Sequence, residues 1–392
     1  AVVMTPGCSF VNRFGEIPEG KLAESIHTSP NWIDGEFRNQ QPTSVMVGKD
    51  GFVEAWWKFL TNSTPDLKPA APLPCTHTDL SALDPSRDIA VWLGHSGLYF
   101  QLAGLRFLVD PVYSAYASPV SFINKSFEFR SGYPFTAKTT PPIDLLILTH
   151  DHWDHLDCET IKALDHKVKR YAVPLGVNSH LLAWGINPDK ILVFDWYDAA
   201  RFTEPKPEVV HPFHKPEKRL QPAEWKSGAL QAPAIYFFPS RHFSGRTLKR
   251  DQTLWGSYVI EAGGKRLYLS GDGGNGPHFK EIGDLFRDSG GFDLAFIEDG
   301  QYNADWAEIH MAPEGSVKAA TEVGAKSVIP IHNCRYALAR HAWYDPLERI
   351  RMASHLADWK LLTPKVGDVV PIGDLTIEFP AWWRDVPKSA SS

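Results

Sequence analysis

Four histidines and aspartates crowd into six positions of the stretch DLLILTHDHWDHLD, residues 144–157: His150, His152, Asp154 and His155. They follow directly on an apolar run that predicts a buried strand. Neutral imidazole nitrogens and carboxylate oxygens bind zinc and related divalent ions. Buried without a partner, the same groups would be costly to desolvate. The residue types and spacing therefore predict a metal site, in which the first two histidines point to one ion and the aspartate and last histidine to a second.

Ligand-type residues also stand just past the last apolar position of four other predicted strands. The stretches are AIYFFPSRH ending at His242, RLYLSGD ending at Asp272, DLAFIED ending at Glu298 and Asp299, and SVIPIH ending at His332. Sites in layered α/β sheets gather beyond the carboxyl ends of strands, so we expect these side chains to meet. A carboxylate at Asp272 could bridge two ions, as in two-metal hydrolases. Taken singly, His242 could equally be a polar loop residue and Asp272 a turn aspartate.

The elements that must position these residues follow from the hydrophobic pattern. Strands outnumber helices early in the chain and alternate with helices later, which predicts a layered α/β or α+β sandwich. We expect an irregular N-terminal extension wrapped on the core over 1–87, the main domain over 88–375 and a C-terminal tail over 376–392. Helical spacing is expected at 51–60, 158–169, 312–325 and 345–359, and a hairpin turn at Gly263-Gly264.

The composition limits the partners and the compartment. The formal net charge is −6 and no long basic run is present, which argues against nucleic acid as a partner. The longest apolar stretch is interrupted by polar residues and does not qualify as a transmembrane helix. The four cysteines lack a C-x-x-C pair and are expected to be free thiols, with Cys158 and Cys334 packed near the site. Gly7-Cys8 could be the remnant of a lipoprotein signal, so a bacterial cell envelope and the cytoplasm both stay open.

As a set, the motifs resemble the metallo-β-lactamase superfamily, and within it the branch that contains N-acyl-phosphatidylethanolamine-hydrolysing phospholipase D and its bacterial relatives. The similarity spans roughly residues 88–370. It is carried by WLGHSGLYF at 92–100, LVDPVYS at 108–114, the H-x-H-x-D-H stretch, SRHFSGR at 240–246, LWGSYVIEAGGKRLYLSGDGG at 254–274 and IHMAPEGSV at 309–317.

This resemblance implies an αββα sandwich with two divalent metal ions at one edge, between the sheets. Zinc is favoured, with iron and manganese as alternatives. The implied ligands are His150, His152 and His242 for one ion, Asp154, His155 and His332 for the other, and Asp272 bridging both. His310 matches a family histidine near the substrate phosphate, although a surface histidine at a helix start would look the same. His95 and Asp110 fit either an orienting role beside the ligands or ordinary core hydrogen bonding.

The implied reaction is hydrolysis, because two ions can lower the pKa of a shared water to about 7 and leave a bridging hydroxide to attack. Asp154 or Asp272 would hold the hydrogen bond of that nucleophile, and His310 and Arg246 would steady substrate oxygens. The favoured substrate is a phosphodiester, as in phospholipase D. Glu298 and Asp299 depart from the lipase pattern, which is uncharged there, and would repel an anionic phosphodiester unless they point away.

Three other functions stay open. A lactonase or other ester hydrolase could use the same scaffold, a metal-binding protein without catalysis could keep the ligands, and a nuclease is disfavoured by the acidic balance. A small molecule or a lipid is expected as substrate. A lipid substrate predicts an apolar groove, to which Trp56, Trp57 and Phe59 could contribute, and peripheral membrane contact.

Overall fold

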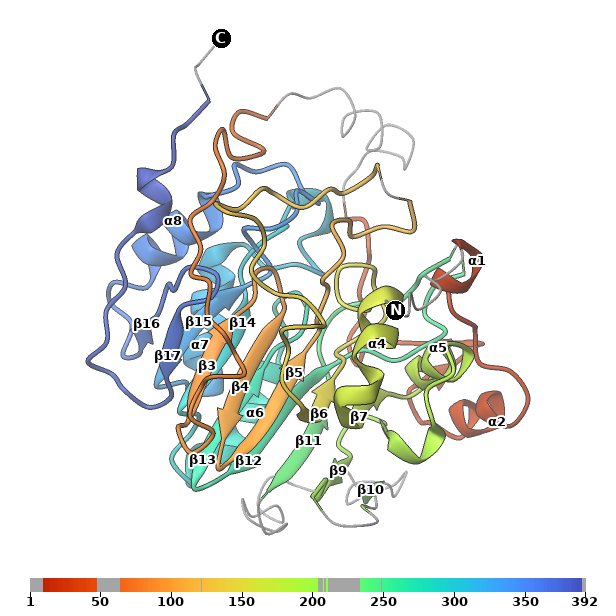
Figure 1. Ribbon diagram of the computed structural model, residues 1–392. Coiled ribbons are helices and arrows are strands. Elements are labelled where there is room, and N and C mark those ends of the chain that lie inside the picture. The colour runs from red at the N-terminus through yellow and green to blue at the C-terminus, as the bar shows by residue number, and fades with distance from the viewer. Residues whose placement is uncertain are drawn as a thin grey trace.

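The computed structural model describes residues 10–47, 64–120, 122–203, 207, 209–210, 233–247 and 249–389. Two large β-sheets dominate these residues (Figure 1). The first sheet has the order β17 (Val369–Pro371), β3 (Ile89–Trp92), β4 (Leu98–Leu102), β5 (Leu105–Val109), β6 (Ile143–Ile147), β7 (Val168–Pro174) and β8 (Ile191–Phe194).

The second sheet has eight strands, and a small pair lies in the N-terminal extension. The order is β10 (Val209–Val210), β9 (Ala199–Ala200), β11 (Ala234–Phe238), β12 (Ser257–Ala262), β13 (Lys265–Leu269), β14 (Leu294–Glu298), β15 (Ser327–Ile331) and β16 (Lys360–Leu361), with β1 (Trp32–Ile33) paired to β2 (Glu36–Phe37). The α-helices are α1 (Phe10–Arg13), α2 (Lys21–His27), α4 (Cys158–Leu164), α5 (Val177–Ala183), α6 (His278–Arg287), α7 (Pro313–Val323) and α8 (Asp345–Ala353).

The sheets stack face to face with helices outside them, so the predicted αββα sandwich is confirmed. Residues of both sheets share one buried cluster, in which Phe100 of β4 stacks on Phe296 of β14 at 6.4 Å between ring centroids. A second cluster packs α6 and α7 onto the eight-stranded sheet, for example through Phe286 and Ala320. Figure 1 shows α4 and α5 beside β6 and β7 of the other sheet.

Strand direction explains why chemistry collects at one edge. β5, β6, β7 and β8 run parallel, as do β13, β14, β15 and β16, while β11 runs antiparallel to β12 and β12 to β13. The carboxyl ends of β11, β13, β14 and β15 therefore lie at the same edge of their sheet. Strands β11, β14 and β15 are buried along their whole length, as expected for strands covered on both faces. The polar residues that follow them are placed by a fully packed core.

Helix predictions succeed where the end signals are local. The helix expected at 312–325 is confirmed as α7, with Gly324 at its end in the left-handed conformation, φ 79°. The hairpin at Gly263-Gly264 is also confirmed. The helix expected at 158–169 is wrong in its second half, because Val168 pairs with Ile143 and begins β7. The helix expected at 345–359 ends at Ala353, and the one expected at 51–60 lies outside the described residues.

In the C-terminal segment, Trp382 and Trp383 are buried against the core. The domain boundaries stay a prediction. Cys75 and Cys334 are free, but the expectation of a free thiol is wrong for Cys158, which is disulfide-bonded. Spacing alone could not show this bond, and Cys8 lies outside the described residues.

No helix in the described part of the chain is long and apolar enough to cross a membrane.

Candidate metal centre

Three imidazoles converge at the end of β6. His150 Nε2 lies 2.9 Å from His152 Nδ1, and His242 Nε2 lies 3.2 Å from the same atom. The first two histidines come from the turn after β6 in one sheet, and His242 comes from the segment after β11 in the other. The two sheets thus supply one cluster of three nitrogens.

The hydrogen bonds behind two of these rings fix which nitrogen carries the proton. His242 Nδ1 lies 3.1 Å from the Ile309 carbonyl oxygen, which can only accept, so Nδ1 donates. Thr149 Oγ1 donates to Asp110 and therefore accepts from His150 Nδ1 at 3.0 Å. The Nε2 atoms of His150 and His242 are left as lone pairs that point into the cluster. Converging lone pairs repel unless a cation lies between them, so this donor set fits a metal ion.

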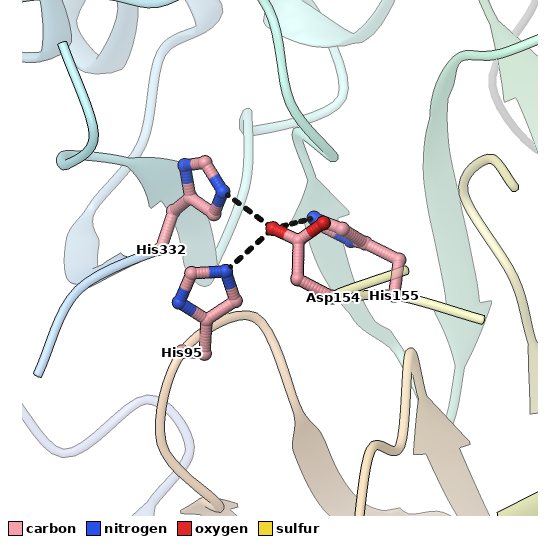
Figure 2. Close-up of side chains that lie close together, drawn as sticks. All are labelled: His95, Asp154, His155 and His332. Atoms are coloured by element: carbon pink, nitrogen blue, oxygen red, sulfur yellow. Dashed lines mark hydrogen bonds and ion pairs between the residues drawn. The ribbon is translucent and has the colours of Figure 1, made fainter. Parts of the chain in front are cut away.

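A second cluster joins two carboxylates to two imidazoles. Asp272 Oδ2 lies 3.0 Å from His155 Nε2 and 3.1 Å from His332 Nε2. Asp154 Oδ2 lies 3.2 Å from His332 Nε2 and 3.5 Å from His155 Nε2 (Figure 2). Asp272 Oδ2 is also 3.8 Å from His150 Nε2 of the first cluster. Its position between the two clusters suits a bridging carboxylate.

Two further residues touch the second cluster from behind. Asp110 Oδ2 accepts from His155 Nδ1 at 2.7 Å, which leaves His155 Nε2 facing the clustered carboxylates. His95, from the turn between β3 and β4, places Nε2 2.8 Å from Asp154 Oδ2 (Figure 2). The sequence left both residues between an orienting role and core hydrogen bonding. In the structure both are buried, and both bond directly to members of the second cluster.

The two clusters differ in their electrostatics. Burial and the neighbouring imidazoles lower the pKa of His150 and His242 well below the ordinary value, and burial brings the pKa of His152 to about 4. Burial acts the same way on His332, but Asp272, Asp154 and Glu298 overcome it and raise the pKa to about 10. Burial is likewise outweighed at His155, where Asp272 and Asp154 raise the pKa well above its usual range. The second cluster therefore favours positive charge, whereas the first cluster consists of neutral imidazoles with nitrogen lone pairs.

Arg246 stabilises the turn that carries the motif. The residue is 4% exposed, and its guanidinium donates to the carbonyl oxygens of Asp151 at 2.9 Å and Leu156 at 2.6 Å. It also lies over the Trp153 ring, 3.9 Å from the centroid. The prediction that Arg246 steadies substrate oxygens is therefore wrong, because its guanidinium already donates to backbone carbonyls at both ends of the turn. The sequence could not show this, since the bonds go to backbone atoms.

A cavity of about 430 Å³ opens over both clusters. Its floor includes His152, Asp154, Asp272, His310 and His332. The walls are largely apolar. They include Met46, Trp153, Phe243, Trp306, Ile309 and Leu338, with the exposed Arg250 also lining the space. The sequence motifs did not identify these wall residues, although Trp153 and Phe243 directly follow His152 and His242. Trp56, Trp57 and Phe59, which were expected to contribute, lie outside the described residues.

The contacts of His310, Glu298 and Asp299 show which of these side chains reaches the cavity. His310 borders the cavity with its side chain 14% exposed, and its Nδ1 hydrogen-bonds the Glu298 carboxylate. Glu298 therefore faces the site from behind the histidines. Asp299 is equally buried but bonds to none of these rings, and burial and the charge of Glu298 raise its pKa well above the ordinary value. Neither acid is exposed in the cavity.

Comparison with known proteins gives a consistent family. The family described as Beta-lactamase superfamily domain matches residues 105–333. An uncharacterized protein of Mycobacterium tuberculosis is 32% identical over 362 residues, covering 91% of this chain and 88% of that protein. N-acyl-phosphatidylethanolamine-hydrolyzing phospholipase D 1 of Caenorhabditis elegans is 27% identical over 300 residues, covering 73% and 76%. The solved isothiocyanate hydrolase from Delia radicum gut bacteria shares the fold, with a TM-score of 0.51, 17% identity and coverage of 72% and 99%.

The unequal electrostatics predict unequal proton release on metal binding. A proton must leave His155 and His332 before their Nε2 atoms can bind a cation, whereas His150 and His242 are already neutral at pH 7. We call the Zn²⁺ ion bound by the second cluster the second equivalent, and the ion bound by the first cluster the first equivalent. Titration of metal-free protein with Zn²⁺ at pH 7, followed with a pH indicator, should release about two more protons for the second equivalent than for the first. Affinity for the second equivalent should fall as the pH is lowered from 9 to 6. Equal release by both equivalents would contradict the assignment.

Asp110→Asn should weaken one metal equivalent selectively. The amide cannot accept from His155 Nδ1 and from both Thr149 donors, so His155 loses its fixed orientation. We expect a loss of about 10- to 100-fold in affinity for the second equivalent, measured by chelator competition. Asp157→Asn is the matched control, because that carboxylate accepts from Ser114 and Thr160 and from no histidine. A similar loss in both variants would show a general effect on folding instead.

Proposed function

This chain belongs to the metallo-β-lactamase superfamily and is a metal-dependent hydrolase, and we propose that its substrate is a phosphodiester, cleaved as in a phospholipase D. The observation that carries the proposal is one constellation: seven ligand-type side chains meet in two adjoining clusters, and His152, Asp154, Asp272 and His332 of these line a cavity with apolar walls and a cationic side chain. Two divalent ions held there would supply an activated water and positive charge for the developing oxyanion. We propose these seven residues as the ligands: His150, His152, Asp154, His155, His242, Asp272 and His332.

The side chains around the floor suit a phosphodiester. Asp272 lines the cavity, and its buried Oδ1 has no hydrogen-bond partner among the described residues, so this oxygen is free to accept a hydrogen bond from the attacking water. Asp154 also borders the cavity, with its Oδ2 fixed by His95. Because Nδ1 of His310 bonds Glu298, its Nε2 is the atom available to a substrate oxygen. Arg250 adds a cation that can pair with an anionic substrate.

The positions of Glu298 and Asp299 support an anionic substrate, although acids beside the site would be expected to repel one. Both carboxylates are fully buried and neither lines the cavity. The charge of Glu298 is opposed by two imidazoles, since His310 and His332 both contact its Oε1. An anionic phosphate in the cavity would therefore not meet Glu298 or Asp299 directly, and Arg250 and His310 are among the residues that line the space. The named activity of the Caenorhabditis elegans relative points to the same substrate class.

A substrate screen tests this proposal directly. The metal-loaded protein should hydrolyse phosphatidylethanolamines, including N-acylated ones, faster than lactones of similar apolar size. Asp272→Asn should abolish turnover of every substrate, because the residue lies between both clusters. Preference for lactones would favour the ester hydrolase, and unchanged turnover in Asp272→Asn would favour a metal-binding protein without this catalysis.

His310→Asn tests whether this side chain contacts the phosphodiester. Loss of a hydrogen-bond donor to a charged phosphoryl oxygen should lower kcat/KM for the phosphodiester by about 100- to 1000-fold. Metal content should stay at the wild-type value, because His310 is not among the seven proposed ligands. An unchanged kcat/KM on the phosphodiester would remove His310 from the reaction.

Peripheral membrane contact is supported by exposed apolar side chains beside the cavity. Phe122 is 82% exposed and Ile123 45% exposed, and the next residue, Asn124, lines the cavity. Helix α1 approaches the same loop, with Arg13 Nη1 donating to the Pro119 carbonyl at 3.2 Å and Phe10 56% exposed. A substrate with acyl chains could pass from a bilayer into a cavity held at this position.

Phe122→Ser should reduce binding to vesicles of phosphatidylethanolamine and phosphatidylcholine by several-fold in a co-sedimentation assay. Leu356→Ser is the matched control, because Leu356 is also 82% exposed but no residue near it in the sequence lines the cavity. Hydrolysis of a short-chain soluble phosphodiester should be equal in both variants. Equal vesicle binding by both variants would refute contact through this loop.

A further inference from the structure

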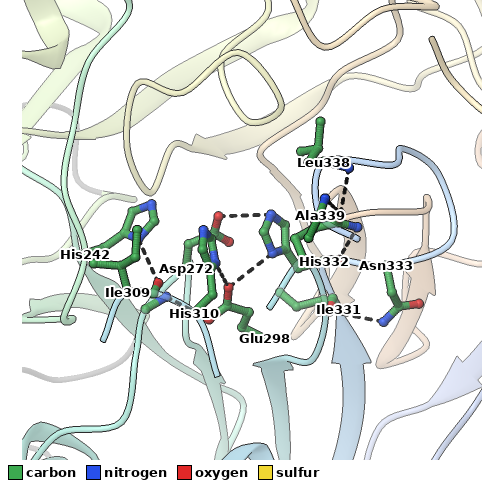
Figure 3. A network of polar contacts seen from close by, with 12 residues as sticks. His242, Asp272, Glu298, Ile309, His310, Ile331, His332, Asn333, Leu338 and Ala339 are labelled. Atoms are coloured by element: carbon green, nitrogen blue, oxygen red, sulfur yellow. Dashed lines mark hydrogen bonds and ion pairs between the residues drawn. The ribbon is translucent and has the colours of Figure 1, made fainter. Parts of the chain in front are cut away.

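Glu298 stands at the junction of the second cluster and the cavity wall. Its Oε1 contacts His332 Nδ1 at 3.1 Å and hydrogen-bonds His310 Nδ1 (Figure 3). The Oε2 atom accepts from the Gly273 amide at 2.9 Å. The side chain is fully buried. One carboxylate oxygen therefore hydrogen-bonds His310, which faces the cavity, and lies within ion-pair distance of His332, which is a proposed ligand.

The backbone leaves this carboxylate little freedom. Glu298 pairs with Ile331 in the parallel ladder of β14 and β15, which places it beside the residue that precedes His332. Its amide donates to Ser270 Oγ at 3.0 Å, and its carbonyl accepts from Ser316 Oγ at 2.7 Å. A side chain that extends from such a fixed point can set the orientation of the rings it contacts.

The contacts determine which nitrogen each ring turns toward the site. An acceptor beside Nδ1 of His332 leaves Nε2 directed at Asp154 and Asp272. An acceptor beside Nδ1 of His310 leaves its Nε2 for the cavity. The two rings lie nearly parallel, with centroids 5.2 Å apart and planes at 18°. A change at Glu298 would therefore reach both rings at once.

We propose that Glu298 is a positioning residue that holds a metal-binding histidine, His332, and a substrate-facing histidine, His310, through a single carboxylate oxygen. The part that concerns His310 rests on the proposed function, and the part that concerns His332 needs only metal binding.

The neighbouring acid supplies a control of the same burial. Asp299 follows Glu298 at the end of β14 and is also 0% exposed. Neither of its carboxylate oxygens has a hydrogen-bond partner among the described residues, and the Ser316 hydroxyl beside it donates to the Glu298 carbonyl instead. Asp299→Asn therefore changes a buried acid at the same place without removing a contact to either histidine.

The test compares Glu298→Gln with Asp299→Asn, using Zn²⁺ alone as the first probe. In Glu298→Gln the amide cannot serve Gly273 as an acceptor and both rings as an acceptor in the native geometry. We expect the affinity for the second Zn²⁺ equivalent to fall by about 10- to 100-fold, with the first equivalent unchanged. Asp299→Asn should bind both equivalents as the wild type does. Wild-type affinity in Glu298→Gln, or the same loss in both variants, would overturn the proposal.

A second readout does not depend on metal or activity. Histidine ring ¹⁵N spectra of the metal-free protein should show a proton on Nδ1 of His310 in the wild type and in Asp299→Asn, and a changed protonation pattern in Glu298→Gln. If Glu298→Gln does not fold, Glu298→Asp keeps the charge but shortens the reach, and should weaken the same equivalent. Wild-type spectra in Glu298→Gln, or wild-type affinity in Glu298→Asp, would count against the link.

Failure of the proposed function gives a different result. A wild-type protein without phosphodiesterase activity, combined with a selective Zn²⁺ loss in Glu298→Gln, would refute the substrate and leave the metal-positioning role intact. With an active wild type, Glu298→Gln assayed at saturating Zn²⁺ should lower kcat more than it raises KM, because His310 loses its orientation. Full activity under that condition would refute the His310 arm of the proposal.

Discussion

The structure depends on one electrostatic constraint at the edge between the sheets. Asp154 and Asp272 lie within 3.5 Å of His155 and His332; Asp272 and both histidines are buried, and Asp154 borders the cavity. Two carboxylates and two imidazoles at such distances need added positive charge, either protons on the rings or cations between them. Because the first cluster contributes only neutral lone pairs, protons alone would satisfy one half of the site and leave the other unpaired. Two divalent cations would satisfy both halves together.

The fold meets this constraint by making the ligand-type residues rigid before any ion arrives. Each follows a strand that is buried in a packed sheet, so its backbone position is set by the core. Hydrogen bonds then fix the rings: Asp110 behind His155, Thr149 behind His150 and the Ile309 carbonyl behind His242. Arg246 anchors the turn between them by its bonds to backbone carbonyls. Such outer contacts are what makes a metal site selective for geometry and not only for charge.

The sequence was informative where one strand end decides the outcome. His242 and His332 could be predicted to approach the motif at His150 because a polar residue after a buried strand must emerge at the sheet edge. The sequence was uninformative where a contact depends on a segment that is distant in the chain. Val168 looks helical beside its neighbours and becomes a strand residue only through pairing with Ile143. Arg246 looked available for substrate, because bonds to backbone carbonyls leave no trace in residue types.

Glu298 shows why the charge of a residue says little until its partners are known. Read along the chain, an acid beside a metal site argues against an anionic substrate. In the fold, the same carboxylate is turned away from the cavity and its charge is shared by two imidazoles and a backbone amide. The field that a substrate meets then comes from what borders the cavity, namely His310, Arg250 and the groups on its floor. A buried acid can in this way serve an anionic substrate, because it orients the hydrogen-bond donor that stands between it and the substrate.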